Sequence, residues 1–138
     1  MIILDTNVLS ELIKEHPNES VLNWIDKQSI DSLYLTSVTI AEMLFGIAIL
    51  PKGKRENSLT HFFQSTCDIF ENRILVFDMI AAKHYARLAA MAKSKGRAFP
   101  VPDGYIAAIA AGKNFFVASR DVSPFQAVHI GTVNPWKT

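Results

Sequence analysis

Four acidic residues stand apart from the other acids of the sequence because of their surroundings. Asp5 directly follows the apolar run MIIL, and Asp121 is the third residue after the apolar run FFVA. Glu42 is the only charged residue in the stretch SVTIAEMLFGIAIL, and Asp103 opens the apolar stretch DGYIAAIAA. If these side chains converge in the fold, they form a site made only of carboxylates.

Such a site needs a counter-charge. Two carboxylates about 4 Å apart repel each other by about 4 kcal/mol at an effective dielectric constant of 20. Hard divalent cations are the usual remedy, because Mg²⁺ binds one or two carboxylates, retains several waters and accepts phosphate oxygens. An acidic pocket without histidine or cysteine ligands therefore predicts Mg²⁺ or Mn²⁺ and chemistry on phosphates.

Each acid also has a purely structural interpretation. Asp5 can cap a helix, and Asp103 can complement the dipole of a helix in its first turn. Glu42 can lie on the solvated side of its helix, and Asp121 can belong to a turn. This alternative weakens when the acids are taken together, because Asp5 and Asp121 follow strands, and α/β sheets bind ligands at the carboxyl ends of their strands.

Other kinds of site find less support. The four histidines are scattered without a ligand pair at i, i+4, which argues against zinc, and the single cysteine, Cys67, is expected in the core. No glycine-rich phosphate-binding loop occurs. The basic clusters Lys52–Arg55 and Lys93–Arg97 are interpreted as solvated helix ends, with phosphate contact as the alternative.

The apolar spacing predicts alternating strands and helices, and hence a parallel sheet in a three-layer α/β fold. Strands are expected at Ile2–Leu4, Leu33–Thr36, Arg73–Phe77 and Phe115–Ser119, with a short fifth at Val128–Ile130. Helices are expected over Val8–Ile13, Glu19–Lys27, Thr39–Leu50, Arg55–Phe70, Met79–Lys95 and Pro102–Ala111. Asn18 and Asp78 are suitable N-caps, and Gly96 is a suitable C-terminal stop.

The composition is typical of one globular domain over residues 1–138, with 49% hydrophobic and 20% charged residues. Because the net charge is only +1, a phosphate-binding surface has to be a local patch. The single cysteine excludes an internal disulfide and suits a reducing compartment. No signal peptide is expected, and the apolar runs Met43–Leu50 and Tyr105–Ala111 are too short to span a bilayer. We therefore expect a soluble, cytoplasmic protein without membrane contact.

Four segments, in this order, resemble the PIN-domain ribonucleases: MIILDTNVLSEL, SVTIAEMLFGI, PDGYIAAIAA and VASRDVSPF. Among these enzymes they are most similar to the VapC/FitB-type toxins of bacterial type II toxin–antitoxin pairs, and the closing VNPWKT resembles the end of FitB-type members. The resemblance covers essentially the whole chain. It implies a single PIN domain, a PIN-like three-layer α/β/α sandwich around a mostly parallel sheet of four to five strands.

The resemblance also implies an activity, the hydrolysis of RNA phosphodiester bonds with Mg²⁺ or Mn²⁺, leaving a 5′-phosphate and a 3′-hydroxyl; transfer RNA is one known substrate of such toxins. It assigns catalysis and metal binding to Asp5, Glu42, Asp103 and Asp121. The polar residues that match supporting positions are Thr6, Asn7 and Ser119, and the serine is expected to orient the site.

Two helices, Thr39–Leu50 and Arg55–Phe70, carry more large apolar side chains than one core-facing stripe requires. Gly46 costs the first helix about 1 kcal/mol relative to alanine, which indicates that something approaches closely there. An exposed apolar groove usually marks an interface. Packing of these helices on each other, or on a second copy of the chain, is the alternative. The predicted groove residues are Met43, Phe45, Gly46, Ile47, Leu50 and Phe62.

For this groove the resemblance implies a partner, the C-terminal segment of a small DNA-binding antitoxin of the VapB/FitA type. It also implies a homodimeric toxin that contacts operator DNA only through the antitoxin complex. An arginine or lysine of the antitoxin is expected to reach the acidic site and to compete there with the metal ion.

Two rival functions are considered, and the residues argue against both. A phosphatase that forms an aspartyl-phosphate would need a second aspartate two residues after Asp5, but position 7 is asparagine. A non-catalytic PIN-fold module that binds RNA or a protein partner is the other rival. The presence of all four acids argues against it.

Overall fold

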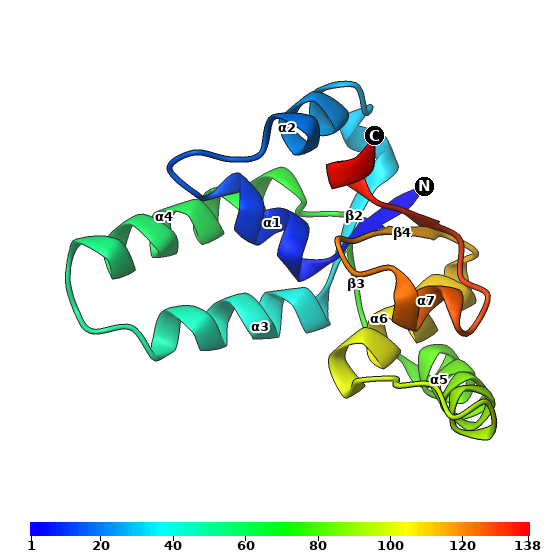
Figure 1. The fold of residues 1–138 in the computed structure, drawn as a ribbon. Helices are drawn as coiled ribbons and strands as arrows, with labels where there is room; N and C mark the ends of the chain where they lie inside the picture. The colour runs from blue at the N-terminus through cyan, green and yellow to red at the C-terminus, as the bar shows by residue number, and fades with distance from the viewer.

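The computed structural model describes residues 1–138 as a central parallel sheet with helices on both sides (Figure 1). The sheet has five strands in the order β3-β2-β1-β4-β5, and every pair of neighbours is parallel. The strands are β1 (Ile2–Leu4), β2 (Leu33–Thr36), β3 (Ile74–Leu75), β4 (Phe116–Ala118) and β5 (Thr132–Val133). The predicted fold class is confirmed.

The first strand lies at the centre of the sheet. Ile2 is paired with Leu33 of β2 on one side and with Phe116 of β4 on the other. Because successive side chains of a strand point to opposite faces, Ile3 and Leu4 enter two different cores. Both are buried, which explains why this strand is apolar without alternation.

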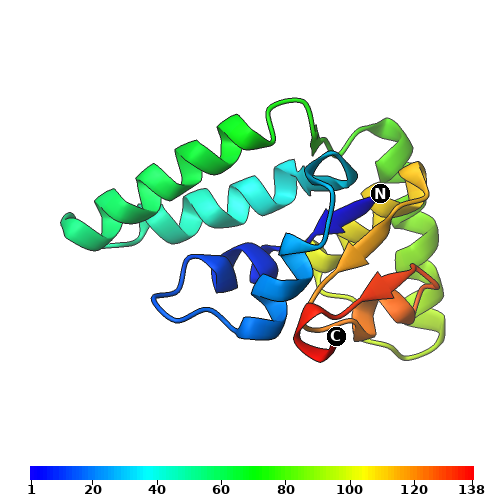
Figure 2. The ribbon, with the colours of Figure 1, turned by 90° about the horizontal axis from the view of Figure 1, so that it is seen from above.

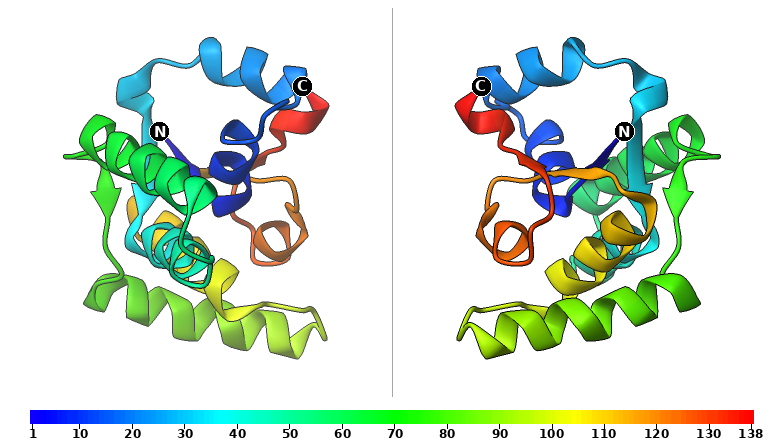
Figure 3. Two further views of the ribbon diagram at one scale, coloured as in Figure 1. Left: turned by 90° about the vertical axis from the view of Figure 1, so that its left-hand side faces the viewer. Right: turned by 90° about the vertical axis from the view of Figure 1, so that its right-hand side faces the viewer.

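Each core lies between one face of the sheet and a group of helices that covers that face (Figure 3). One group comprises α1 (Thr6–Leu12), α2 (Glu19–Asp26) and the end of α4 (Lys54–Ile69). The other comprises α5 (Met79–Ser94), α6 (Val101–Lys113) and α7 (Ser123–Gln126). Two 3₁₀ turns, η1 (Ile30–Ser32) and η2 (Pro135–Lys137), complete the elements. No helix is long and apolar enough to cross a membrane.

The helix α3 (Ser37–Ala48) leaves the sheet and runs beside α4 as a hairpin that extends away from the strands (Figures 1 and 2). Its N-cap is Thr36, whose side chain accepts a hydrogen bond from the amide of Thr39. The cap places the start of α3 two residues before the predicted start. The end of β2 and the beginning of α3 are therefore directly connected.

Three helix boundaries carry the local signals predicted for them, whereas α7 was not predicted. Asn18 caps α2 and Asp78 caps α5, each by accepting hydrogen bonds from amides of the first turn. Gly96 follows α5 with φ 64°, a left-handed conformation that glycine adopts without steric cost. These three predictions are confirmed.

The fifth strand was predicted at the wrong residues. Val128–Ile130 is not a strand: Val128 is buried, His129 has φ 63°, and the amide of Ile130 donates to the carbonyl of Phe125. These residues form a turn after α7, in which Val128 and Ile130 pack on the core, and β5 follows the turn. The third strand is confirmed but shorter than predicted, ending before Val76, which is 61% exposed at the sheet edge.

Candidate active site

Three of the predicted acids line one cavity at the carboxyl end of the sheet. Asp5 follows β1, Glu42 lies in the second turn of α3 beyond β2, and Asp103 lies in the first turn of α6. The cavity measures about 380 Å³. Residues distant in sequence thus meet where parallel sheets bind ligands.

Asp5 is buried and held by several hydrogen bonds. Its Oδ1 accepts from the amide of Thr6 at 2.8 Å, which makes Asp5 the N-cap of α1. Its Oδ2 accepts from Ser119 Oγ at 2.7 Å and from Asn7 Nδ2 at 3.3 Å. Burial raises the pKa of the carboxyl although these hydrogen bonds oppose the rise. The structural role as a helix cap and the place in the cavity therefore coexist.

Glu42 is oriented by the first helix. Thr6 Oγ1 donates to Glu42 Oε1 at 2.7 Å, and the same hydroxyl lies 3.2 Å from Oγ1 of the buried Thr39. Thr6 consequently contacts the site twice, through its amide to Asp5 and through its hydroxyl to Glu42. Thr39 was not predicted as a site residue, although it lies within the segment SVTIAEMLFGI.

Asp103 lines the cavity but accepts no hydrogen bond from the protein. Burial, and then the charges of Asp5, Glu42 and Asp121, raise the pKa of its carboxyl to about 6. The helix turn that carries it is packed tightly, because a Cβ at Gly104 would lie 2.9 Å from the Tyr85 ring. The glycine after Asp103 therefore lets α6 approach α5.

Asp121 lies at the margin of the site. It is exposed and is absent from the cavity lining. Its Oδ1 accepts from the amide and the hydroxyl of Ser123, at 3.2 and 2.8 Å. Its charge nevertheless contributes to the raised pKa values of Asp5 and Asp103. The structure thus separates Asp121 from the other three acids, and its role as a metal ligand stays a prediction.

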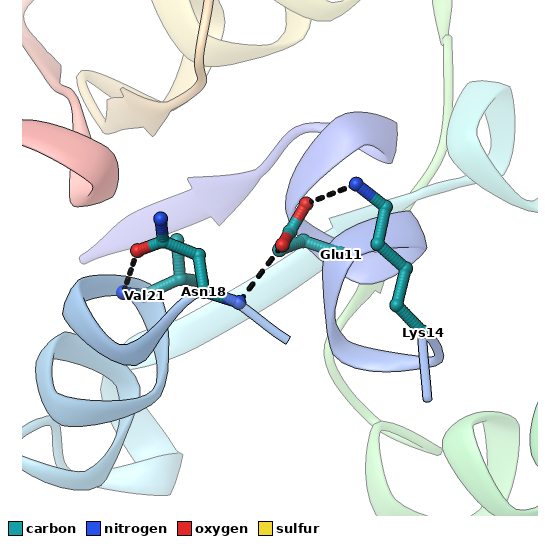
Figure 4. A network of polar contacts seen from close by, with 4 residues as sticks. All are labelled: Glu11, Lys14, Asn18 and Val21. Atoms are coloured by element: carbon teal, nitrogen blue, oxygen red, sulfur yellow. Dashed lines mark hydrogen bonds and ion pairs between the residues drawn. The ribbon is translucent and has the colours of Figure 1, made fainter. Parts of the chain in front are cut away.

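Glu11 in α1 and Lys14 just after α1 also line the cavity, and neither was predicted as a site residue. Glu11 is buried and accepts from Lys14 Nζ at 2.7 Å and from the amide of Asn18 at 2.9 Å (Figure 4). The hydrogen bond from Lys14, then that from the Asn18 amide, hold the pKa of Glu11 below its ordinary value. The i, i+3 spacing of Glu11 and Lys14 is the signal that could have identified this pair.

The remaining lining residues come from distant parts of the chain. Arg120 follows β4 and Trp136 lies in η2, and both line the same cavity as Asp5. Arg120 is adjacent to Ser119 in the sequence, and Trp136 belongs to the closing VNPWKT. Ser10 completes the lining.

The donors of this cavity suit a hard divalent ion. The acids offer only oxygen ligands, and four of them (Asp5, Glu11, Glu42 and Asp103) line the cavity against two cationic side chains, Lys14 and Arg120. No three ligand-type side chains lie close enough to enclose an ion by themselves. Such an open arrangement fits Mg²⁺, which keeps waters and binds substrate phosphates.

A second cavity continues from the first between α3 and α4, and the two share Thr6, Ser10 and Glu42. It is the groove predicted from the apolar residues of the two helices. Its lining includes Met43, Gly46, Ile47, Leu50, Leu59 and Phe62. Phe45 does not line it and is 66% exposed. A Cβ at Gly46 would meet no atom within 4 Å, so nothing in this chain requires glycine there.

Comparisons with known proteins show which family and which solved structures this chain is similar to. The family model of the PIN domain matches residues 2–129. The VapC ribonuclease Y4jK of Sinorhizobium fredii is 46% identical over 138 residues, covering 99% of both chains. The toxin FitB of Neisseria gonorrhoeae is 42% identical over 137 residues, again covering 99% of both. The solved structure of FitAB bound to an IR36 DNA fragment matches with a TM-score of 0.94 and 42% identity, covering 99% of this chain and 96% of that one.

Proposed function

This chain belongs to the PIN-domain family, and from that membership and its acidic cavity we propose that it is a metal-dependent endoribonuclease, the toxin of a type II toxin–antitoxin pair. The observation that carries the proposal is the meeting of Asp5, Glu42 and Asp103 in one cavity. Residues 1–138 act as a single PIN domain in this proposal.

In the proposed reaction, Asp5 and Asp103 would hold Mg²⁺ or Mn²⁺, and Glu42 or Asp121 would orient the attacking water or hold a second ion. A bound divalent ion supplies charge stabilisation at the phosphate and a water of lowered pKa. Ser119 and Asn7 keep the Asp5 carboxylate in one orientation, and Thr6 does the same for Glu42. No side chain needs to form a covalent intermediate.

The test is RNA cleavage by the purified protein with Mg²⁺, with EDTA, and by the Asp5→Asn variant. Cleavage is expected from the wild-type protein with Mg²⁺, but not with EDTA and not from the Asp5→Asn variant. Asp26→Asn is a matched control, because Asp26 is exposed at the end of α2, outside the cavity. A protein that binds RNA without cutting it under all conditions would instead be the non-catalytic module.

For the groove we propose the C-terminal segment of a VapB/FitA-type antitoxin as the occupant. The groove is lined mainly by apolar side chains of α3 and α4, with Arg55 at the start of α4, and it ends at Glu42 in the acidic cavity. A helix in the groove can therefore place a basic side chain among the carboxylates. The proposed complex contains a homodimeric toxin, contacts operator DNA through the antitoxin, and is cytoplasmic.

Inhibition and metal binding should then compete. Co-purification with the product of the neighbouring gene, followed by cleavage assays across a Mg²⁺ series, tests this. The expected result is slow cleavage that recovers as Mg²⁺ increases. A complex that cuts RNA as fast as the free protein would contradict the proposed occupant.

A further inference from the structure

Two cationic side chains line the acidic cavity, and only one of them is paired. Lys14 Nζ lies 2.7 Å from Glu11 Oε2. Arg120 forms no ion pair, and its guanidinium donates no hydrogen bond. Instead the guanidinium carbon lies 5.6 Å from the centre of the Trp136 ring. Arg120 is thus an unpaired cation at the rim of a site rich in carboxylates.

The contact with an aromatic face matters because of what it leaves free. A cation–π contact with a ring face does not use the N–H groups of the guanidinium, so its five donors remain available. Contact with the indole also restricts a side chain that otherwise has many rotamers. Less conformational entropy is then lost when a ligand binds.

The main chain at Arg120 is held on both sides. Its amide donates to Asn7 Oδ1 at 3.2 Å, and its carbonyl accepts from Asn134 Nδ2 at 3.0 Å. The same Asn134 side chain accepts from the amide of Trp136 at 3.0 Å. One asparagine therefore fixes the arginine and the tryptophan relative to each other.

We propose that Arg120 binds a phosphate of the substrate RNA beside the acidic cavity, and that Trp136 is a positioning residue for its guanidinium. This inference rests on the proposed function. RNA that approaches three carboxylates is repelled, and a free guanidinium with its donors exposed supplies attraction and planar recognition of phosphate oxygens. The purely structural alternative is that the pair only anchors η2 to the loop after β4.

The experiment compares Arg120→Ala with Arg87→Ala, which removes an exposed arginine of α5 outside the cavity. Cleavage kinetics are measured with Mg²⁺, and affinity for a short single-stranded RNA is measured in EDTA over a salt series. Arg120→Ala should raise KM about tenfold or more, as expected for a lost hydrogen bond to a charged group. It should also reduce the slope of log affinity against log salt by about 0.7. Arg87→Ala should leave both unchanged.

Two further variants separate charge from positioning. Arg120→Lys should retain the salt slope but raise KM, because the planar fork is lost. Trp136→Leu keeps an apolar side chain but removes the ring face, and should raise KM without changing the salt slope. Melting curves of all variants identify a loss of folding. If Arg120→Ala does not fold, the comparison of Arg120→Lys with the wild type decides.

Wild-type KM and salt slope in folded Arg120→Ala would overturn the proposal. An unchanged KM in Trp136→Leu would overturn the positioning role alone. A wild-type protein that binds RNA without metal-dependent cleavage would contradict the proposed function, whereas the salt slope would still decide on Arg120. A wild type without RNA affinity would overturn both.

Discussion

The hydroxyl of Ser119 donates to Asp5 Oδ2 at 2.7 Å and so joins residues 114 positions apart in the sequence. Both side chains are buried, and each follows a strand of the adjacent pair β1 and β4. The hydrogen bond therefore couples the orientation of the carboxylate to the register of the sheet. Ser119 therefore orients Asp5, a candidate metal ligand, as hydrogen-bonding partners of metal ligands commonly do.

Ser119→Ala removes this donor while Asp5 keeps its hydrogen bonds with Thr6 and Asn7. We expect kcat for RNA cleavage to fall about 10- to 100-fold, the usual cost of losing such an orienting partner. Ser119→Thr, which restores a hydroxyl, should recover part of the activity. Steady-state kinetics check this, and a wild-type kcat in folded Ser119→Ala would remove the serine from the site.

Asp5→Ala and Asp103→Ala should both abolish cleavage but change stability in opposite directions. Asp5 caps α1 and accepts three hydrogen bonds, so its loss should lower the melting temperature. Asp103 accepts none, and its removal relieves repulsion in the metal-free protein. Thermal melts in EDTA measure the difference. A melting temperature of Asp5→Ala that is not below that of the wild type would show that the hydrogen bonds of Asp5 do not stabilise the fold.

The stability of the metal-free protein should fall as the pH rises from about 4 to 6. Folding raises the pKa of Asp103 from 3.8 to about 6, so the folded protein binds more protons than the unfolded chain in this window. The raised pKa of Asp5 acts in the same direction. Partial exposure of Asp103 limits its contribution to about 1 kcal/mol. Denaturant titrations at several pH values in EDTA test this, and Asp103→Asn should show a shallower dependence.

Mg²⁺ or Mn²⁺ should raise the melting temperature of the wild-type protein. An ion that binds only the folded state stabilises it by about 2.7 kcal/mol at a hundredfold excess over its Kd. The gain should be larger at pH 7.5 than at pH 5, because protons compete for Asp103 at the lower pH. Calorimetry with Asp103→Asn as the control measures it. A melting curve that millimolar Mg²⁺ and Mn²⁺ leave unmoved would argue against the metal site.

Gly46→Ala should stabilise the free protein yet weaken binding of the antitoxin. Alanine favours the helix by about 1 kcal/mol and meets no atom within 4 Å in this chain. It does, however, narrow the groove where a partner would lie. Ile47→Glu should also prevent binding, whereas Phe45→Glu changes a residue outside the groove and should not. Affinity measurements on the three variants decide, and tight binding by Gly46→Ala and Ile47→Glu would place the antitoxin elsewhere.

Local patterns in the sequence determined much of this protein. Hydrophobic spacing placed the strands at Ile2–Leu4 and Leu33–Thr36 correctly, and the caps at Asn18 and Asp78 followed from the side-chain chemistry of single residues. The candidate acids were also visible, because a charge that interrupts an apolar run is a local anomaly. Helix and strand periodicities arise from neighbours in sequence, so the sequence alone carries them.

Tertiary packing decided the rest. The turn at His129 moved the fifth strand to Thr132–Val133, because the apolar residues before it were needed in the core. Packing also drew Asp5, Glu42 and Asp103 together but left Asp121 bonded to Ser123 outside the cavity. The apolar side chains of α3 were divided between the groove and solvent, with Phe45 on the outside. The cation–π contact of Arg120 with Trp136 joins two segments that no periodicity relates. Such contacts depend on how whole elements pack, which no window of neighbouring residues encodes.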